Sequence, residues 1–107
     1  SETREFQTRY TNGEYSASGN YISPGGPEEV GVTLTLERDM ITDVTFTERA
    51  VNPISKNFQK MFADTYKPFV VGRSIDDVSL TKISGSSLTP QGFQDALRKI
   101  KTDASRS

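Results

Sequence analysis

The chain has 107 residues, of which 33% are hydrophobic and 25% charged, and its formal net charge is −1. This balance indicates one globular domain with a modest core, and it lacks the basic excess with which proteins neutralise nucleic-acid phosphates. The absence of Cys, His and Trp excludes disulfides, thiol chemistry, iron–sulfur ligation by Cys, the usual zinc sites and Ser-His or Cys-His nucleophile pairs. Any redox role therefore requires a bound organic cofactor.

The first eleven residues are polar, with two interspersed aromatic side chains, and we interpret residues 1–11 as a linker or N-terminal arm and residues 12–107 as the domain. Apolar or small residues alternate with polar ones at 15–19, as in a half-buried strand. The Pro- and Gly-rich residues 23–27 predict a loop.

The clearest strand lies at residues 30–36, where Val and Leu alternate with Gly and Thr. Arg38 and Asp39 predict a short reversal, and residues 41–47 then form a second β-rich segment. Because both segments alternate with period two, we expect an antiparallel hairpin whose apolar faces meet the helices.

Asn52 suits the N-cap and Pro53 the first turn of a helix that should end before Pro68, because the residue before a proline is biased away from helical geometry. Its apolar face is expected to consist of the residues at helical spacing, namely Ile54, Phe58, Met61, Phe62, Thr65 and Tyr66. Further on, Ser74 predicts the cap of a single turn. Asp76 and Asp77 are adjacent, which is not a metal-ligand spacing, and they are interpreted as the solvated start of that turn.

The last helix is predicted to begin with Thr89 as N-cap and Pro90 as first helical residue. Its apolar face follows the helical spacing of Phe93, Ala96, Leu97, Ile100 and Ala104. Strands that precede helices and are joined by short loops predict an α+β domain, an antiparallel sheet with helices packed on one side. No apolar run is long enough to span a bilayer and no signal sequence opens the chain. The abrupt polar start leads us to expect an upstream signal or lipid anchor.

A hydroxyl-rich turn at residues 84–89 precedes this helix. Free backbone N–H groups and the helix dipole at such a start favour a phosphate or another anion. Gly85 permits close approach of backbone and phosphate, and the neighbouring serines supply hydroxyls. Taken alone, this pattern is also that of an ordinary loop followed by a helix cap.

With its surroundings, the turn resembles the attachment motif of the bacterial FMN-binding domain family, which includes domains of the sodium-pumping NADH:quinone reductase and of the related Rnf complex. The family motif runs Asp-x-x-Ser/Thr-Gly-Ala-Thr/Ser, and its last hydroxyl carries FMN through a phosphoester. Ser84 and Gly85 match the motif, Ser86 replaces its Ala, Ser87 stands at the flavinylated hydroxyl and Thr81 replaces its Asp. Other blocks similar to the family's lie at residues 12–19, 38–44, 52–55 and 71–76.

The resemblance implies an FMN-binding-domain-like fold that holds FMN, covalently or non-covalently. The cofactor-binding residues that it implies are Ser84, Gly85, Ser86, Ser87, Leu88, Thr89, Asn52 and Ser55. Helix capping is the alternative role for Asn52 and Ser55. Five aromatic side chains are candidates for the walls around the flavin ring as well as for the core, namely Tyr15, Tyr21, Phe62, Tyr66 and Phe69.

The implied function is that of a bacterial electron carrier outside the cytoplasm, at the cell surface or peripheral to a membrane. A flavin transferase and a redox protein are its implied partners. No set of general acids and bases indicates a complete enzyme. The departures at Thr81 and Ser86 keep an alternative open, a cofactor-free interaction or structural module on the same scaffold.

Overall fold

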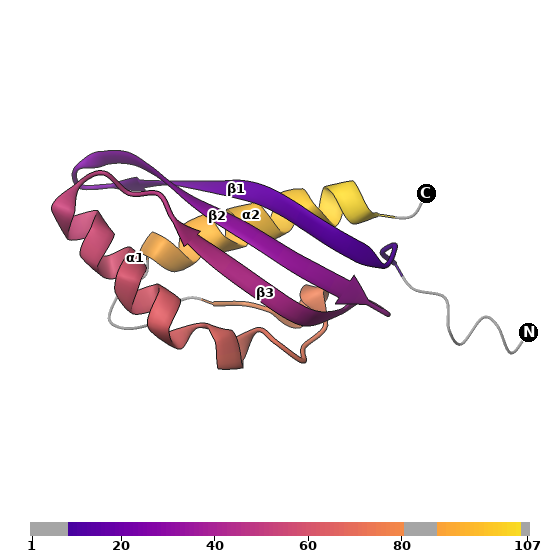
Figure 1. The fold of residues 1–107 in the computed structure, drawn as a ribbon. Coiled ribbons are helices and arrows are strands. Elements are labelled where there is room, and N and C mark those ends of the chain that lie inside the picture. The colour runs from indigo at the N-terminus through magenta and orange to yellow at the C-terminus, as the bar shows by residue number, and fades with distance from the viewer. Residues whose placement is uncertain (1–8, 81–87, 106–107) are drawn as a thin grey trace, which may run out of the picture.

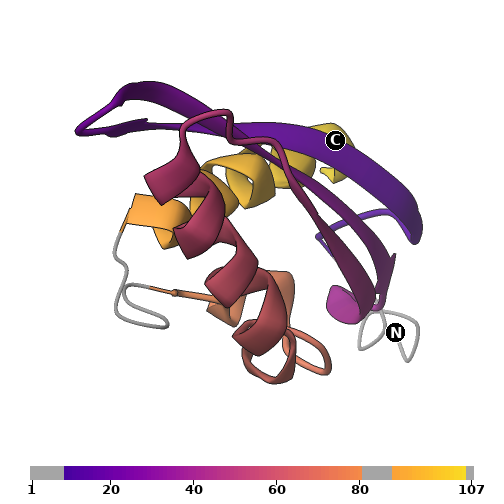
Figure 2. The same cartoon turned by 60° about the vertical axis from the view of Figure 1, so that its left-hand side comes forward.

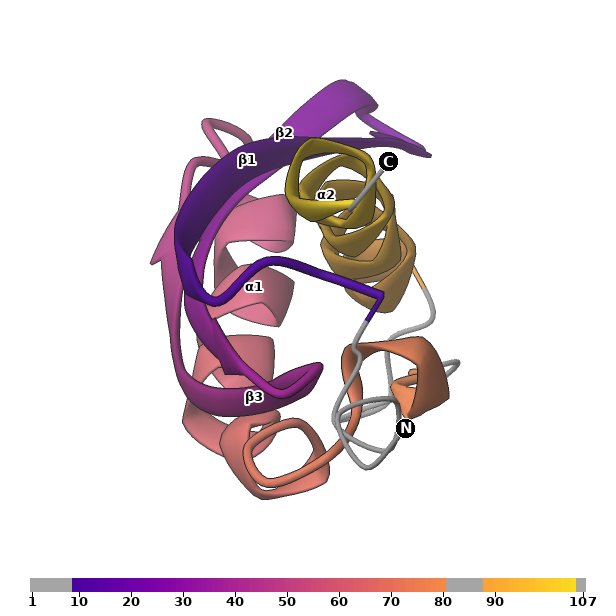
Figure 3. The ribbon, with the colours of Figure 1, turned by 90° about the vertical axis from the view of Figure 1, so that its right-hand side faces the viewer.

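A computed structural model of the chain describes residues 9–80 and 88–105. In chain order its elements are β1 (Gly13–Ser23), β2 (Gly26–Glu37), β3 (Met40–Glu48), α1 (Pro53–Thr65), the 3-10 turns η2 (Lys67–Phe69) and η3 (Ile75–Asp77), and α2 (Leu88–Ala104). The strands form an antiparallel sheet of order β1-β2-β3 (Figure 1). The sheet curves around α1 and α2, which share its concave side (Figure 3). The predicted α+β architecture is therefore confirmed.

Two tight turns connect the strands. Ser23 pairs with Gly26, so the loop predicted at residues 23–27 is shorter than expected. Arg38 and Asp39 both adopt positive φ, at 53° and 67°, a geometry whose twist matches that of the flanking strands. The predicted hairpin forms in register, with Leu34 paired to Val44.

The core lies between the sheet and the two helices. The four inward-facing aliphatic side chains of β2 are at most 2% exposed, namely Val30, Val32, Leu34 and Leu36. An aromatic group fills the centre, where the Phe62 ring lies 5.2 Å from Tyr66 and 5.4 Å from Phe93 between centroids. Phe62 and Tyr66, which were candidates for a flavin wall, thus take the core role.

Helix α1 has the predicted boundaries but not the predicted face. Asn52 caps it, its Oδ1 accepting hydrogen bonds from the N–H groups of Ile54 at 2.9 Å and Ser55 at 3.3 Å. The buried positions are Ser55, Gln59, Phe62 and the C-cap Tyr66. Of the residues noted at helical spacing, Phe62 and Tyr66 are buried, whereas Ile54, Phe58 and Met61 are exposed, because the helix is rotated so that a polar residue, Gln59, points inward.

The Gln59 side chain is fully buried and joins three parts of the fold. Its Oε1 accepts from the backbone N–H of Arg49 at 2.9 Å and of Ala50 at 3.2 Å. Its Nε2 donates to the Tyr21 hydroxyl at 2.8 Å and to the Glu29 carbonyl at 3.1 Å. Burial of a side-chain amide costs free energy unless its hydrogen-bonding groups have partners. Because the Gln59 amide finds its partners only when it points inward, these bonds fix the rotation of α1.

Helix α2 begins at Leu88, one residue before the predicted cap. Thr89 is consequently helical and does not act as the N-cap, and Pro90 is tolerated because N–H groups of the first turn have no partner within the helix. All five residues of the predicted apolar face are buried: Phe93, Ala96, Leu97, Ile100 and Ala104. Neither α1 nor α2, as described, is long and apolar enough to cross a membrane.

Candidate functional site

The predicted attachment motif is only partly described. Thr81, Ser84, Gly85, Ser86 and Ser87 lie outside the described residues. Leu88 and Thr89 belong to the first turn of α2, where Leu88 is partly buried and Thr89 is 1% exposed. The Thr89 side chain therefore lies inside the protein.

Asn52 and Ser55 both have structural partners. The Asn52 carboxamide caps α1, and Ser55 is buried with its Oγ 3.5 Å from that of Ser23. The Asn52 side chain also lines an open hollow of about 520 Å³ beside the β1–β2 turn, with Asn20, Gly25, Pro27, Glu28, Glu29, Arg49 and Val51. The capping role considered for Asn52 is thus observed, and its amide remains next to open space.

Tyr21 connects the first halves of both helices. Its hydroxyl accepts from Gln59 of α1, and its ring lies against Gly92 of α2, so close that a Cβ on Gly92 would sit 2.6 Å from Cδ1. Both helices begin toward the end of the molecule that carries the β1–β2 turn (Figure 1). The fold therefore places Asn52 and Ser55 at the same end of the domain as Leu88 and Thr89.

A stripe of apolar side chains runs along one flank of α1. It consists of Ile54, Phe58 and Met61, which are 69%, 37% and 38% exposed, and we call it the α1 stripe. Their spacing of four and three residues places them one above the other on the helix. A contiguous apolar surface of this kind marks an interaction site more often than isolated exposed side chains do.

The α1 stripe and the polar residues of α1 lie on different flanks of the helix. The opposite flank of α1 is polar, and its residues line a hollow with the end of β3; this hollow is formed by Glu48, Ala50, Pro53, Lys56, Asn57 and Lys60. Figure 2 shows β3 on one side of α1 and the start of α2 on the other. The α1 stripe is thus an exposed apolar surface on a helix that begins at the same end of the domain as α2.

The described residues at this end offer the α1 stripe and two open hollows. Among the described residues, no three His, Cys, Asp or Glu side chains converge as metal ligands. No buried side-chain nitrogen or oxygen lacks a hydrogen bond there either. The α1 stripe is the exposed apolar surface that α1 presents.

Sequence reasoning missed the α1 stripe because it assigned the same residues to the core. One signal was available. A second set of residues also follows helical spacing, namely Ser55, Gln59, Phe62 and Tyr66. The polar Gln59 in this set indicates a buried side chain with hydrogen-bond partners, and not that this face of the helix is exposed.

In comparisons with known proteins, no family model matches this chain, and no curated protein or solved structure matches it. The likeness to the FMN-binding domain family rests on the sequence blocks quoted above.

Proposed function

We propose that this chain is an electron-transfer flavodomain that works outside the bacterial cytoplasm and carries FMN on Ser87 through a phosphoester. A flavin transferase installs the cofactor in this proposal, and a redox protein exchanges electrons with it. FMN, when bound, supplies the redox chemistry. The protein's own part is to bind the phosphate, hold the ring and limit its access to water.

The observation that carries the proposal is the exposed α1 stripe on a helix that begins at the same end of the domain as α2. The isoalloxazine ring of FMN is flat and largely apolar, and it needs such a surface. A phosphate joined immediately before Leu88 would lie at a helix N-terminus, which favours negative charge. A hydroxyl attachment point and an apolar surface at one end of a small domain support a tethered aromatic cofactor.

The attachment is tested by co-expression with a bacterial flavin transferase, followed by intact mass and peptide mapping. The expected product gains the mass of FMN less one water, located on Ser87, and Ser87→Ala does not gain it. Covalent flavin that persists in Ser87→Ala would place the phosphoester on another hydroxyl, with Ser86 as the nearest. Absence of flavin from both proteins, whether covalent or retained non-covalently, would contradict the proposed function.

Contact between ring and α1 stripe is tested with Phe58→Ala in the flavin-loaded protein. Loss of the Phe58 ring should let the flavin rotate more freely and so lower its fluorescence anisotropy. Met40→Ala is the control, since Met40 is an apolar side chain at the start of β3 whose exposed fraction of 38% is close to that of Phe58. If both variants have the same flavin anisotropy, the flavin ring does not contact the α1 stripe. That result would leave the proposed attachment to Ser87 untouched.

The second candidate is a cofactor-free interaction or structural module, and the α1 stripe supports it too, as a contact for another protein. Visible absorption distinguishes the two candidates. A purified protein with the flavin spectrum supports the carrier. A colourless protein from a host that has the transferase supports the module.

A further inference from the structure

Residues 9–11 are attached to the end of α2 that lies far from the proposed flavin site. The N–H of Thr11 donates to the carbonyl oxygen of Ala104 at 2.8 Å, and Tyr10 forms an isolated antiparallel bridge with Ser105. The N-terminal segment thus pairs with the C-terminal end of α2.

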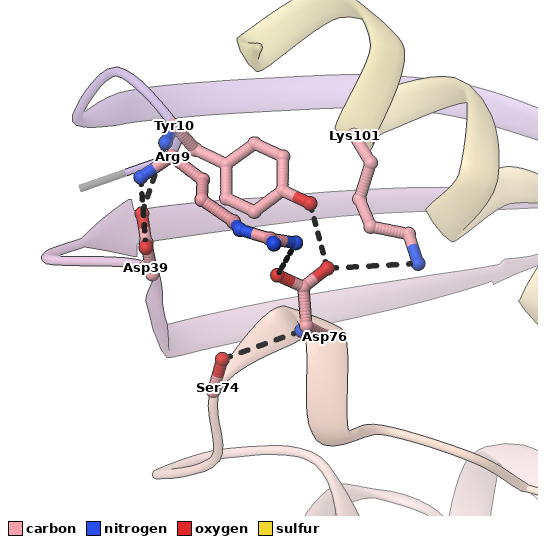
Figure 4. A network of polar contacts seen from close by, with 6 residues as sticks. All are labelled: Arg9, Tyr10, Asp39, Ser74, Asp76 and Lys101. Atoms are coloured by element: carbon pink, nitrogen blue, oxygen red, sulfur yellow. Dashed lines mark hydrogen bonds and ion pairs between the residues drawn. The ribbon is translucent and has the colours of Figure 1, made fainter. Parts of the chain in front are cut away.

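Tyr10 anchors this segment in the core. Its side chain is 7% exposed and belongs to the same apolar cluster as Ile100 and Ala104. Its hydroxyl donates to Oδ1 of Asp76 at 2.6 Å. Asp76 also lies 3.3 Å from the Arg9 guanidinium and 3.9 Å from the Lys101 ammonium (Figure 4).

The two carboxylates that bind residues 9 and 10 lie in two turns, Asp39 in the β2–β3 turn and Asp76 in η3. Asp39 accepts from the backbone N–H of Arg9 at 2.9 Å and of Tyr10 at 3.0 Å, from a left-handed position in the β2–β3 turn. Asp76 lies in η3, whose first turn is capped by the Ser74 hydroxyl as predicted from the sequence (Figure 4). The backbone N–H groups of Arg9 and Tyr10 thus donate to the Asp39 carboxylate, and the Tyr10 hydroxyl donates to that of Asp76. Hydrogen bonds to carboxylates are strong.

We infer that residues 9–11 form a latch, a unit that closes onto Asp39, Asp76 and Ala104 and opens without unfolding the rest of the domain. The latch has one buried side chain, and Arg9 remains 76% exposed. It joins β1 through Gly13, whose φ of 151° suits glycine. Segments with few buried contacts open at lower free energy than the core does.

The closed latch also fixes the place of Arg9 relative to the two ends of α2. The 17 residues of α2 span about 25 Å, and the latch binds at the C-terminal end of this helix. Arg9 is therefore held at the end of α2 opposite to Leu88. Opening of the latch releases residues 9–11 from that end of α2, while the helix start stays in place.

Amide hydrogen exchange of the full chain, resolved by NMR, tests the latch. In Tyr10→Phe and Asp76→Asn, the amides of Tyr10 and Thr11 should exchange about tenfold to a hundredfold faster, while those of β2 and α1 keep their protection. Asp64→Asn is the matched control, because Asp64 forms only an exposed ion pair with Lys60 among the described contacts.

Two results would overturn the inference. Unchanged exchange at Tyr10 and Thr11 in both variants would show that Asp76 does not hold the segment. An equal rise throughout the molecule would show that the segment unfolds with the whole domain. Asp39→Asn gives an independent variant, since asparagine tolerates the left-handed backbone of Asp39 but accepts hydrogen bonds less strongly, and it should accelerate the same amides.

Discussion

Gly19 of β1 and Gly92 of α2 touch backbone to backbone. A Cβ on Gly19 would lie 1.7 Å from the carbonyl oxygen of Gly92, and a Cβ on Gly92 would press against the Tyr21 ring. Glycine inside a helix costs about 1 kcal/mol relative to alanine. The close packing of α2 onto β1, which positions the start of α2, offsets this cost.

Gly19→Ala should therefore destabilise the domain by at least about 2–3 kcal/mol, since backbone rather than a side chain must move. Denaturant unfolding measures this as a lower midpoint. Gly31→Ala is the control, because the three atoms nearest to its Cβ would all belong to the half-exposed side chain of Arg49, which can move aside at a cost below about 1 kcal/mol. Equal losses in the two variants would contradict the backbone contact.

Gln59→Leu should be more destabilising than an ordinary polar substitution. Leucine fills a similar space, but it leaves the N–H groups of Arg49 and Ala50 and the Glu29 carbonyl without their partner. Each unsatisfied buried group costs about 1–3 kcal/mol, so we expect a total loss of at least about 3 kcal/mol in chemical denaturation. Asn57→Leu, at an exposed position of the same helix, should stay within about 0.5 kcal/mol of the parent. If both variants lose a similar amount of unfolding free energy, Gln59 is not the residue that sets the rotation of α1.

Stability should fall at alkaline pH through two tyrosines. Burial raises the pKa of Tyr10 to about 12, with a further contribution from the hydrogen bond and charge of Asp76, and burial likewise raises the pKa of Tyr66 to about 12. The folded state holds these protons more tightly than the unfolded state, in which the pKa is near 10. The resulting stabilisation is complete below pH 10 and is lost as the pH rises to 12.

Urea unfolding at a series of pH values measures this loss, and tyrosinate absorbance follows the titration directly. Tyr10→Phe and Tyr66→Phe should each reduce the slope of unfolding free energy against pH between 10 and 12. If the double variant retains the full slope, other groups cause the alkaline loss.

The strands and turns were predictable because their signals are local. Alternation in residues 30–36 and the reversal at Arg38 and Asp39 depend on neighbours along the chain. The inward face of α1 was not predictable, because two overlapping sets of residues follow helical spacing. Which set is buried depends on the hydrogen bonds of Gln59 with Tyr21 and Glu29, which are far away in sequence. The contact of Gly19 with Gly92 likewise depends on the packing of distant elements. Of the candidate site, the Asn52 cap followed from the local Asn-Pro pair, whereas the exposure of the α1 stripe required the helix rotation.

Asn52 provides a test that separates capping from cofactor binding. Asn52→Ala removes the acceptor for the N–H groups of Ile54 and Ser55 and should cost about 1 kcal/mol, whereas Asn52→Asp keeps an acceptor and should cost little. If capping is its only role, the flavin-loaded forms of both variants will have the parent's absorption spectrum and covalent flavin content. A spectral shift in Asn52→Asp at unchanged stability would instead place the ring beside Asn52, because a new carboxylate near the isoalloxazine alters its electronic environment while leaving the helix cap intact.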